Sequence, residues 1–226
     1  HSFCCAVPGC WHVMGVTQAA GLSLRWFRDT LGHDYLKEAE QAGLDPYVVM
    51  DHHVEHVPMG SRRLLYLPYL MGERTPHLDP DCRGVFFGLS AIHTQDDMLR
   101  AVMEGVGYSL TDCQDILRDM GIVVQEMMAC GGGGRSQLWR QMLADMYNCE
   151  VKTVSSKEGP ALGAAILAGV GAGLFKSVVT ACRDFIDTNT YCQPDPTAHA
   201  YYEKGHALYQ KLYRQLAGCY QDLATL

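Results

Sequence analysis

Short hydrophobic runs alternate along this chain with stretches in which apolar residues recur every three or four positions, a pattern typical of an α/β domain. Two β-rich runs flank the turn signal Pro8-Gly9, which predicts a hairpin over residues 1–16. Apolar spacing then predicts a helix over residues 18–31, and the polar segment 33–57 predicts one or two further helices. The N-terminal part of the chain is therefore expected to be a hairpin followed by helices.

The middle of the chain predicts two short strands and one long helix. Residues 64–70 and 84–89 are apolar runs of strand length. Residues 94–121 carry apolar positions at helical spacing, and the first residue of this stretch is a threonine, a good helix cap. Gly105 and Gly107 lie inside this helix, where a missing Cβ lets another backbone come close. The helix is therefore expected to pack directly on a sheet.

The loop between the two strands, residues 71–84, combines prolines and glycines with charges of both signs. The charged side chains of this loop must pair with one another or with a binding partner. One interpretation pairs Arg74 or Arg83 with Asp79 or Asp81, and the other gives the loop a function. The sequence alone leaves both open.

The most informative stretch is a strand, a turn of four consecutive glycines from Gly131 to Gly134, and a helix begun by Ser136. Glycines let the backbone come close to a ligand, and a helix start offers unpaired N–H groups to an anion. This predicts a site for a phosphate-bearing ligand, and the alternative is a flexible turn without a ligand. Ser136 stands where the dinucleotide fingerprint needs Gly or Ala, and the run also lacks the Gly-Lys-Ser/Thr of a Walker loop.

The C-terminal part predicts one more strand, over residues 150–155, and then mostly helix. The small residues of a helix over 158–167 predict close packing or room for a flat ligand. Residues 177–185 predict an amphipathic helix. After a proline-containing loop, Thr197 is expected to cap a C-terminal helix whose apolar stripe faces the core.

The composition is that of an ordinary globular protein, with 226 residues, 48% of them apolar, and a formal net charge of −7. The negative charge argues against nonspecific binding to nucleic acid or anionic membrane, and no apolar run approaches the roughly 20 residues of a membrane span. The ten cysteines contain no C-x-x-C pair, which favours reduced, buried thiols in a cytoplasmic protein. His52 and His56 have the spacing of a shared metal site, but no third ligand is indicated, so a solvated helix face is favoured and no metal ligand is assigned.

Several motifs together resemble the FGGY family of carbohydrate kinases. The segment Gly84-x-Phe86-x-Gly88-Leu89, followed after seven residues by Asp97-Met98-x-x-Ala101-Val102-Met103-Glu104, matches the second signature of the family at every defined position. Residues 67–84 are most similar to the xylulose kinase branch, and residues 131–145 and 159–165 are also typical of the family. The resemblance covers nearly the whole chain.

The resemblance implies an α/β fold, namely an actin-like ATPase or ribonuclease H-like domain with a mixed sheet flanked by helices. Residues 1–226 would be most of the C-terminal, nucleotide-binding domain of a two-domain sugar kinase. The chain does not begin with methionine and starts inside a predicted strand, so the N-terminal part of this domain and the N-terminal sugar-binding domain are expected to be missing.

The resemblance also implies where ATP binds. By position, Gly131, Gly132 and Gly133 approach the α-phosphate and adenosine, and Ser136 lies beside the base, where relatives often have asparagine. Arg25 and Trp26 match the place where relatives close the adenine pocket. The family's catalytic aspartate and its phosphate loops are absent from the sequence, so no catalytic residue is assigned here. The ligands of Mg²⁺ are expected mainly outside this chain.

The implied activity is ATP-dependent phosphorylation of a sugar, first of all D-xylulose to D-xylulose 5-phosphate, with this chain inactive alone. Kinases for ribulose, gluconate or glycerol stay open, as does a noncatalytic nucleotide-binding module. The expected partners are ATP or ADP and a sugar held mostly by the missing domain, with no nucleic acid and no membrane. The loop of residues 72–84 is a candidate contact surface for a homodimer.

Overall fold

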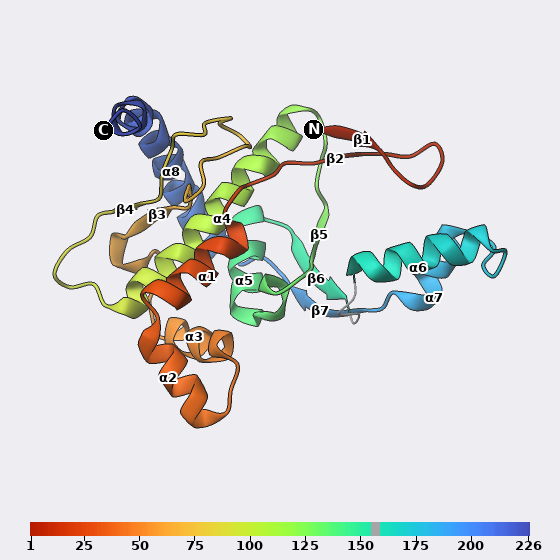
Figure 1. Ribbon diagram of the computed structural model, residues 1–226, viewed down its shortest axis with the longest axis horizontal. Helices are drawn as coiled ribbons and strands as arrows, with labels where there is room; N and C mark the ends of the chain where they lie inside the picture. Colours follow the sequence, from red (N-terminus) through yellow and green to blue (C-terminus); the bar gives the residue numbers. More distant parts are fainter. Residues whose placement is uncertain (155–158) are drawn as a thin grey trace.

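The computed structural model describes residues 1–154 and 159–226, and its helices surround small sheets (Figure 1). The helices are α1 (Ala20–Thr30), α2 (His33–Ala42), α3 (Pro46–Glu55), α4 (Gln95–Asp119), α5 (Gln137–Tyr147), α6 (Gly159–Gly171), α7 (Val178–Phe185) and α8 (Pro196–Leu223), with 3₁₀ turns η1 (Ser61–Arg63) and η2 (Gly133–Arg135). The strands are β1 (Ser2–Cys4), β2 (Trp11–Val13), β3 (Leu65–Leu67), β4 (Val85–Phe87), β5 (Glu126–Ala129), β6 (Glu150–Val154) and β7 (Thr188–Cys192). None of the helices in the described ranges is long and apolar enough to cross a membrane.

The predicted N-terminal hairpin is confirmed. Strands β1 and β2 pair antiparallel, with Phe3 opposite His12, and Gly9 takes a positive φ of 77° in the connecting turn. Helices α1, α2 and α3 follow, as the apolar spacing predicts. In Figure 1 the α2–α3 pair lies at one end of the molecule, below α1 and α4.

Helix α4 is the central element, and its start is fixed locally. The Thr94 hydroxyl accepts from the Asp97 N–H while the Asp97 carboxylate accepts from the Thr94 N–H, which is a complete capping box. Further along, α4 lies directly on β3, since a Cβ at Gly105 would stand 2.1 Å from the Tyr66 carbonyl oxygen. The predicted close approach of helix and strand is therefore confirmed.

Strands β5, β6 and β7 form a mixed sheet. The pair β5–β6 is parallel and the pair β6–β7 is antiparallel, with Val151 opposite Cys192. Helix α5 connects the parallel strands, so β5, α5 and β6 form a βαβ unit. The strand β7 differs from the sequence prediction of a loop, which follows from the nearby Pro194 and Pro196. Its threonines and tyrosine are residues that strands favour, and pairing with β6 forms the strand.

Helix α8 closes the core, but its cap differs from the prediction. Asp195, and not Thr197, is the N-cap, since the Asp195 Oδ1 accepts from the N–H groups of Thr197 and Ala198 at 2.8 Å each. Pro196 then occupies the first helical position, where its lack of an N–H has no cost. The helix packs on α4 and α5, and its buried face includes Tyr202 and Tyr209.

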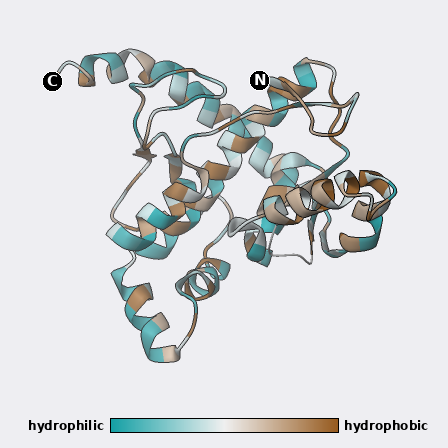
Figure 2. Cartoon of the chain, turned by 45° about the vertical axis from the view of Figure 1, so that its right-hand side comes forward, coloured by the Kyte–Doolittle hydropathy of each residue, from teal (hydrophilic) through white to brown (hydrophobic). Residues whose placement is uncertain are grey.

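Helices α6 and α7 form a pair that packs mainly on itself (Figure 1). Close packing at a small residue is found at Gly169, where a Cβ would lie 2.4 Å from the Phe175 ring. Apolar residues are spread along α6, as the brown segments in Figure 2 show, and Leu174 and Val179 are exposed.

Two further expectations need correction. All ten cysteines are free, but only Cys82, Cys113, Cys149 and Cys192 are buried. In the loop of residues 71–84, neither arginine pairs with an aspartate within the described part of the chain.

The loop is held in another way. The Arg83 Nη1 donates to the carbonyl oxygens of Pro80 and Cys82, both at 2.8 Å. The Asp79 carboxylate accepts from the Tyr213 hydroxyl at 2.9 Å. Its other oxygen accepts from the N–H groups of Asp81 and Cys82, so the partners of this aspartate are α8 and the backbone of the loop, and not an arginine.

Candidate functional site

The Gly-rich turn has two open glycines and two packed ones. Gly131 has a positive φ of 74°, and a Cβ at Gly131 or Gly132 would meet no atom within 4 Å. In contrast, a Cβ at Gly133 would lie 2.9 Å from the Trp139 ring, and one at Gly134 would lie 2.7 Å from the Ala129 carbonyl oxygen. The last two glycines are thus required by the packing of the protein, and the first two leave space beside the backbone.

Ser136 begins α5, as predicted, and its hydroxyl is the cap of this helix. It accepts from the Trp139 N–H at 3.0 Å. The carboxylate of Asp51 on α3 lies close enough to this hydroxyl for its pKa to be affected. Burial raises the pKa of Asp51, while the Ser136 hydroxyl and the positive charge of Arg140 act in the opposite direction. The start of α5 and Asp51 of α3 are therefore neighbours.

A cavity of about 400 Å³ lies beside the turn. Gly132, Gly133 and Gly134 line one side of it, and Ala20 and Gly21 at the start of α1 line another. The remaining lining comes mainly from apolar residues of α4, β5 and α5, namely Val106, Leu110, Met127, Met128, Ala129, Trp139 and Leu143. The turn and the start of α1, far apart in the sequence, thus share one cavity.

The start of α1 is suited to an anion. Its N-cap, Ala19, makes no side-chain hydrogen bond to the first turn, so the first N–H groups of the helix have no side-chain partner. A helix N-terminus also carries a partial positive charge. The sequence analysis missed Ala20 and Gly21. The run Ala19-Ala20-Gly21 of small residues at a helix start was the available signal.

Arg25 and Trp26 lie further along α1 and do not line this cavity. The Trp26 ring is half-buried and stacks on Tyr66, with ring centroids 6.5 Å apart and an interplanar angle of 8°. Arg25 is exposed. Their place in an adenine pocket therefore stays a prediction.

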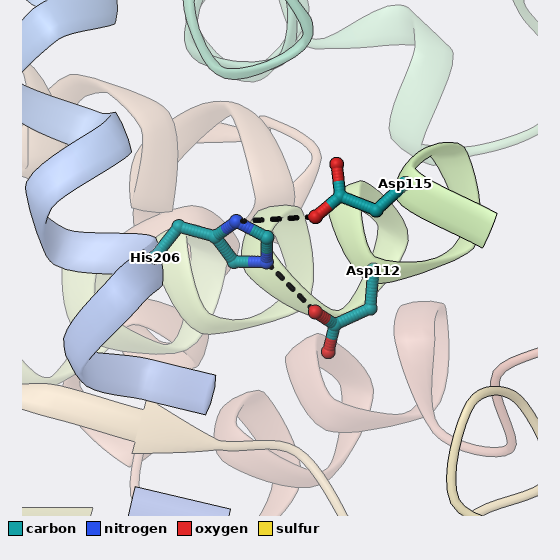
Figure 3. A group of neighbouring side chains, drawn as sticks. All are labelled: Asp112, Asp115 and His206. Atoms are coloured by element: carbon teal, nitrogen blue, oxygen red, sulfur yellow. Dashed lines mark hydrogen bonds and ion pairs between the residues drawn. The ribbon is translucent and has the colours of Figure 1, made fainter. Parts of the chain in front are cut away.

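A second group of polar side chains joins α4 to α8 (Figure 3). Asp112, Asp115 and His206 offer ligand atoms within 4.8 Å of one another, a spacing compatible with a metal ion. However, the two ring nitrogens of His206 face different carboxylates, with Nε2 2.8 Å from Asp112 and Nδ1 3.9 Å from Asp115. Gln210 Nε2 also donates to Asp112 at 2.8 Å. The group is therefore best described as a tether between two helices.

Removing this tether is expected to destabilise the fold. The substitution His206→Ala leaves the Asp112 carboxylate, which is 4% exposed, with one partner fewer. We expect the free energy of unfolding to fall by about 1–3 kcal/mol, as for the loss of a hydrogen bond to a charged group. Denaturant unfolding followed by circular dichroism measures this change. The control is His52→Ala, an exposed site on α3, which should stay within about 0.5 kcal/mol of wild type, and equal stability of both variants would contradict the prediction.

The comparisons with known proteins agree with one another. The family model described as the C-terminal domain of the FGGY family of carbohydrate kinases matches residues 1–172. A xylulose kinase from Staphylococcus epidermidis is 38% identical over 226 residues, all of this chain and 44% of the relative. A gluconokinase from Bacillus licheniformis is 36% identical over 222 residues, which cover 95% of this chain and 42% of the relative.

The solved structures show the same likeness. The ligand-bound crystal structure of a xylulose kinase from Lactobacillus acidophilus superposes with a TM-score of 0.79 at 30% identity, covering 92% of this chain and 40% of that one. The fold is therefore the actin-like ATPase fold of these kinases, as predicted. The chain spans less than half the length of the relatives it matches.

Proposed function

Since this chain belongs to the FGGY family of carbohydrate kinases, we propose that it is the C-terminal, nucleotide-binding domain of a two-domain sugar kinase and holds the nucleoside part of ATP. The observation that carries this proposal is the cavity shared by the Gly-rich turn and the uncapped start of α1. The turn offers backbone N–H groups without a Cβ in the way, and the start of α1 offers them beside Gly21 and the small side chain of Ala20, an arrangement that suits a phosphate chain.

In this proposal the nucleotide lies along the turn. Gly131, Gly132 and Gly133 approach the phosphates and adenosine, and the N–H groups at Ala20 and Gly21 add a second anion contact. Ser136 lies beside the base while it caps α5. Arg25 and Trp26 would border the adenine from α1.

Mg²⁺ accompanies ATP in such kinases, and we propose that its ligands lie mainly outside this chain. No carboxylate is found among the described residues that line the cavity. Carboxylates and water are the ligands that Mg²⁺ prefers. In phosphoryl transfer the bound metal neutralises charge on the phosphates, and this chain contributes positioning of the nucleotide. Without a catalytic aspartate and a sugar site, the chain alone is expected to phosphorylate no sugar.

D-Xylulose is the proposed substrate, with gluconate as the second candidate. The name xylulose kinase belongs to the relative at 38% identity, and the name gluconokinase to one at 36%. These identities are too similar to decide the matter, and residues 67–84 carry the motif that favours xylulose. Phosphorylation assays with a sugar panel on the whole kinase would identify the substrate. A homodimer through residues 72–84 stays a prediction that sedimentation would test.

The test of nucleotide binding is a calorimetric titration of ADP into the purified chain, compared with Gly132→Val. A Cβ at position 132 meets no protein atom within 4 Å, so we expect valine to occupy ligand space and the fold to tolerate it. We expect wild type to bind ADP and the variant to lose at least about 30-fold in affinity, because 2 kcal/mol or more of contact is lost.

The matched control is Gly218→Val on α8, where a Cβ also meets open space but far from the cavity. It should bind ADP like wild type. If wild type and Gly132→Val bind ADP equally, the nucleotide does not lie on this turn. If none of the three proteins binds ADP, the chain is not a nucleotide-binding domain by itself.

A further inference from the structure

Arg140 on α5 is a buried cation that contacts the Gly-rich turn. The residue is 5% exposed. One nitrogen, Nη1, donates to the Gly134 carbonyl oxygen at 2.6 Å and to the Arg135 carbonyl oxygen at 3.0 Å. The guanidinium therefore holds the end of the turn, residues of η2, against the helix that follows.

The burial of Arg140 has a free-energy cost. Burying a guanidinium costs several kcal/mol unless its charge and its donors are compensated. Within the described ranges no carboxylate lies close enough to Arg140 for an ion pair, and its Nε has no hydrogen-bond partner. The carboxylate of Asp51 on α3 acts on it from beyond ion-pair distance. The two carbonyl oxygens of the turn are thus its main partners.

The backbone of the Gly-rich turn needs a contact that restrains it. Four consecutive glycines lose more conformational entropy on ordering than any other residues, so an unrestrained turn would have to be ordered by its ligand. A residue that orders the turn beforehand removes this cost from the binding step. Arg140 fixes the carbonyls of the packed end, while Gly131 and Gly132 have open space beside them and Gly132 lines the cavity.

We infer that Arg140 is a positioning residue that holds the Gly-rich turn in its nucleotide-binding shape. The effect on affinity rests on the proposed nucleotide function. The ordering of the turn does not rest on that function, because it follows from the two hydrogen bonds of Arg140 alone.

The experiment compares Arg140→Met, Arg140→Lys and Arg135→Met in the full chain. Lysine keeps the charge, and its Nζ has three donors that can replace the single Nη1 at both carbonyls. Arg135 lies on the same turn and is exposed, so Arg135→Met removes one positive charge without removing the buried contact. Two measurements are made on each variant: hydrogen–deuterium exchange of the peptide covering residues 131–136, and calorimetric titration of ADP.

For Arg140→Met we expect exchange in residues 131–136 to accelerate at least about 10-fold and ADP affinity to fall at least about 10-fold, as for lost hydrogen bonds to a charged group. Exchange in α8 should stay as in wild type, which separates local loosening from unfolding. Arg140→Lys should have nearly the exchange rate and the ADP affinity of wild type, and Arg135→Met should change neither quantity.

Unchanged exchange in Arg140→Met would overturn the inference, as would an equal affinity loss in Arg135→Met, since charge alone would then explain it. If wild type does not bind ADP, the proposed function fails, and the exchange measurement still decides the role of Arg140. If Arg140→Met does not fold, Arg140→Gln takes its place in both measurements.

Discussion

The substitution Gly105→Ala is expected to lower the free energy of unfolding by about 3 kcal/mol or more. The new methyl group would stand 2.1 Å from the Tyr66 carbonyl oxygen, and 2.9 Å from the carbonyl carbon. Both atoms belong to the backbone of β3, so no change of rotamer relieves the contact and α4 must move away from the strand. Overpacking of a core commonly lowers stability by about 1–3 kcal/mol, and a clash between two backbones is expected to lower it by about 3 kcal/mol or more.

The matched control makes the same change where there is room. Gly218→Ala lies within α8, and its new Cβ meets open space. Because alanine is the better helix former by up to about 1 kcal/mol, this variant should be slightly more stable than wild type. Denaturant unfolding of both proteins measures the difference. A Gly105→Ala variant as stable as wild type would show that α4 does not lie on β3 at this distance.

The second large effect is expected for Glu104→Leu, next to Gly105 on α4. Glu104 is 2% exposed and accepts four hydrogen bonds. The donors are the Gly60 N–H, the Ser61 hydroxyl, the Arg100 Nε and the Tyr202 hydroxyl, at 2.9, 2.9, 2.9 and 3.1 Å. The carboxylate thus joins α4, the segment before η1 and α8. Leucine would leave Arg100 buried without its counter-charge, which costs about 3–5 kcal/mol.

Two comparisons test this explanation. Asp29→Ala breaks an exposed pair with Arg28 and should cost no more than about 1 kcal/mol. The double variant Arg100→Met with Glu104→Leu removes both charges and should be more stable than Glu104→Leu alone, because no unpaired buried charge is left. If the double variant is the less stable of the two, the cost comes from lost packing and not from the unpaired arginine.

Features determined by neighbouring residues could be predicted from the sequence. The helix caps at Thr94 and at Ser136 each depend on residues within a few positions of the chain, and both are confirmed. The position of the Gly-rich turn between β5 and α5 is confirmed for the same reason. The motif resemblance identified the family and the fold, and the comparisons confirm both.

Features that depend on distant contacts could not be predicted. Strand β7 is defined by its pairing with β6, which the proline-containing sequence around it does not indicate. Asp79 is bound by Tyr213 and not by the arginines beside it. At the candidate site, the start of α1 and the Gly-rich turn line one cavity although they are far apart in the sequence, so no local spacing indicates Ala20 and Gly21 as neighbours of Gly132.

The docking of α8 also determines when the fold can be completed during synthesis. Tyr213 reaches back 134 positions to Asp79, and Tyr202 reaches back 98 positions to Glu104. At the roughly 5–20 residues per second of translation, Tyr213 is synthesised about 7–27 s after Asp79. Until then the apolar surfaces that α8 covers on α4 and α5 are open to other chains and to chaperones. The rate of elongation, and not the rate of helix formation, therefore limits the closing of this core on the ribosome.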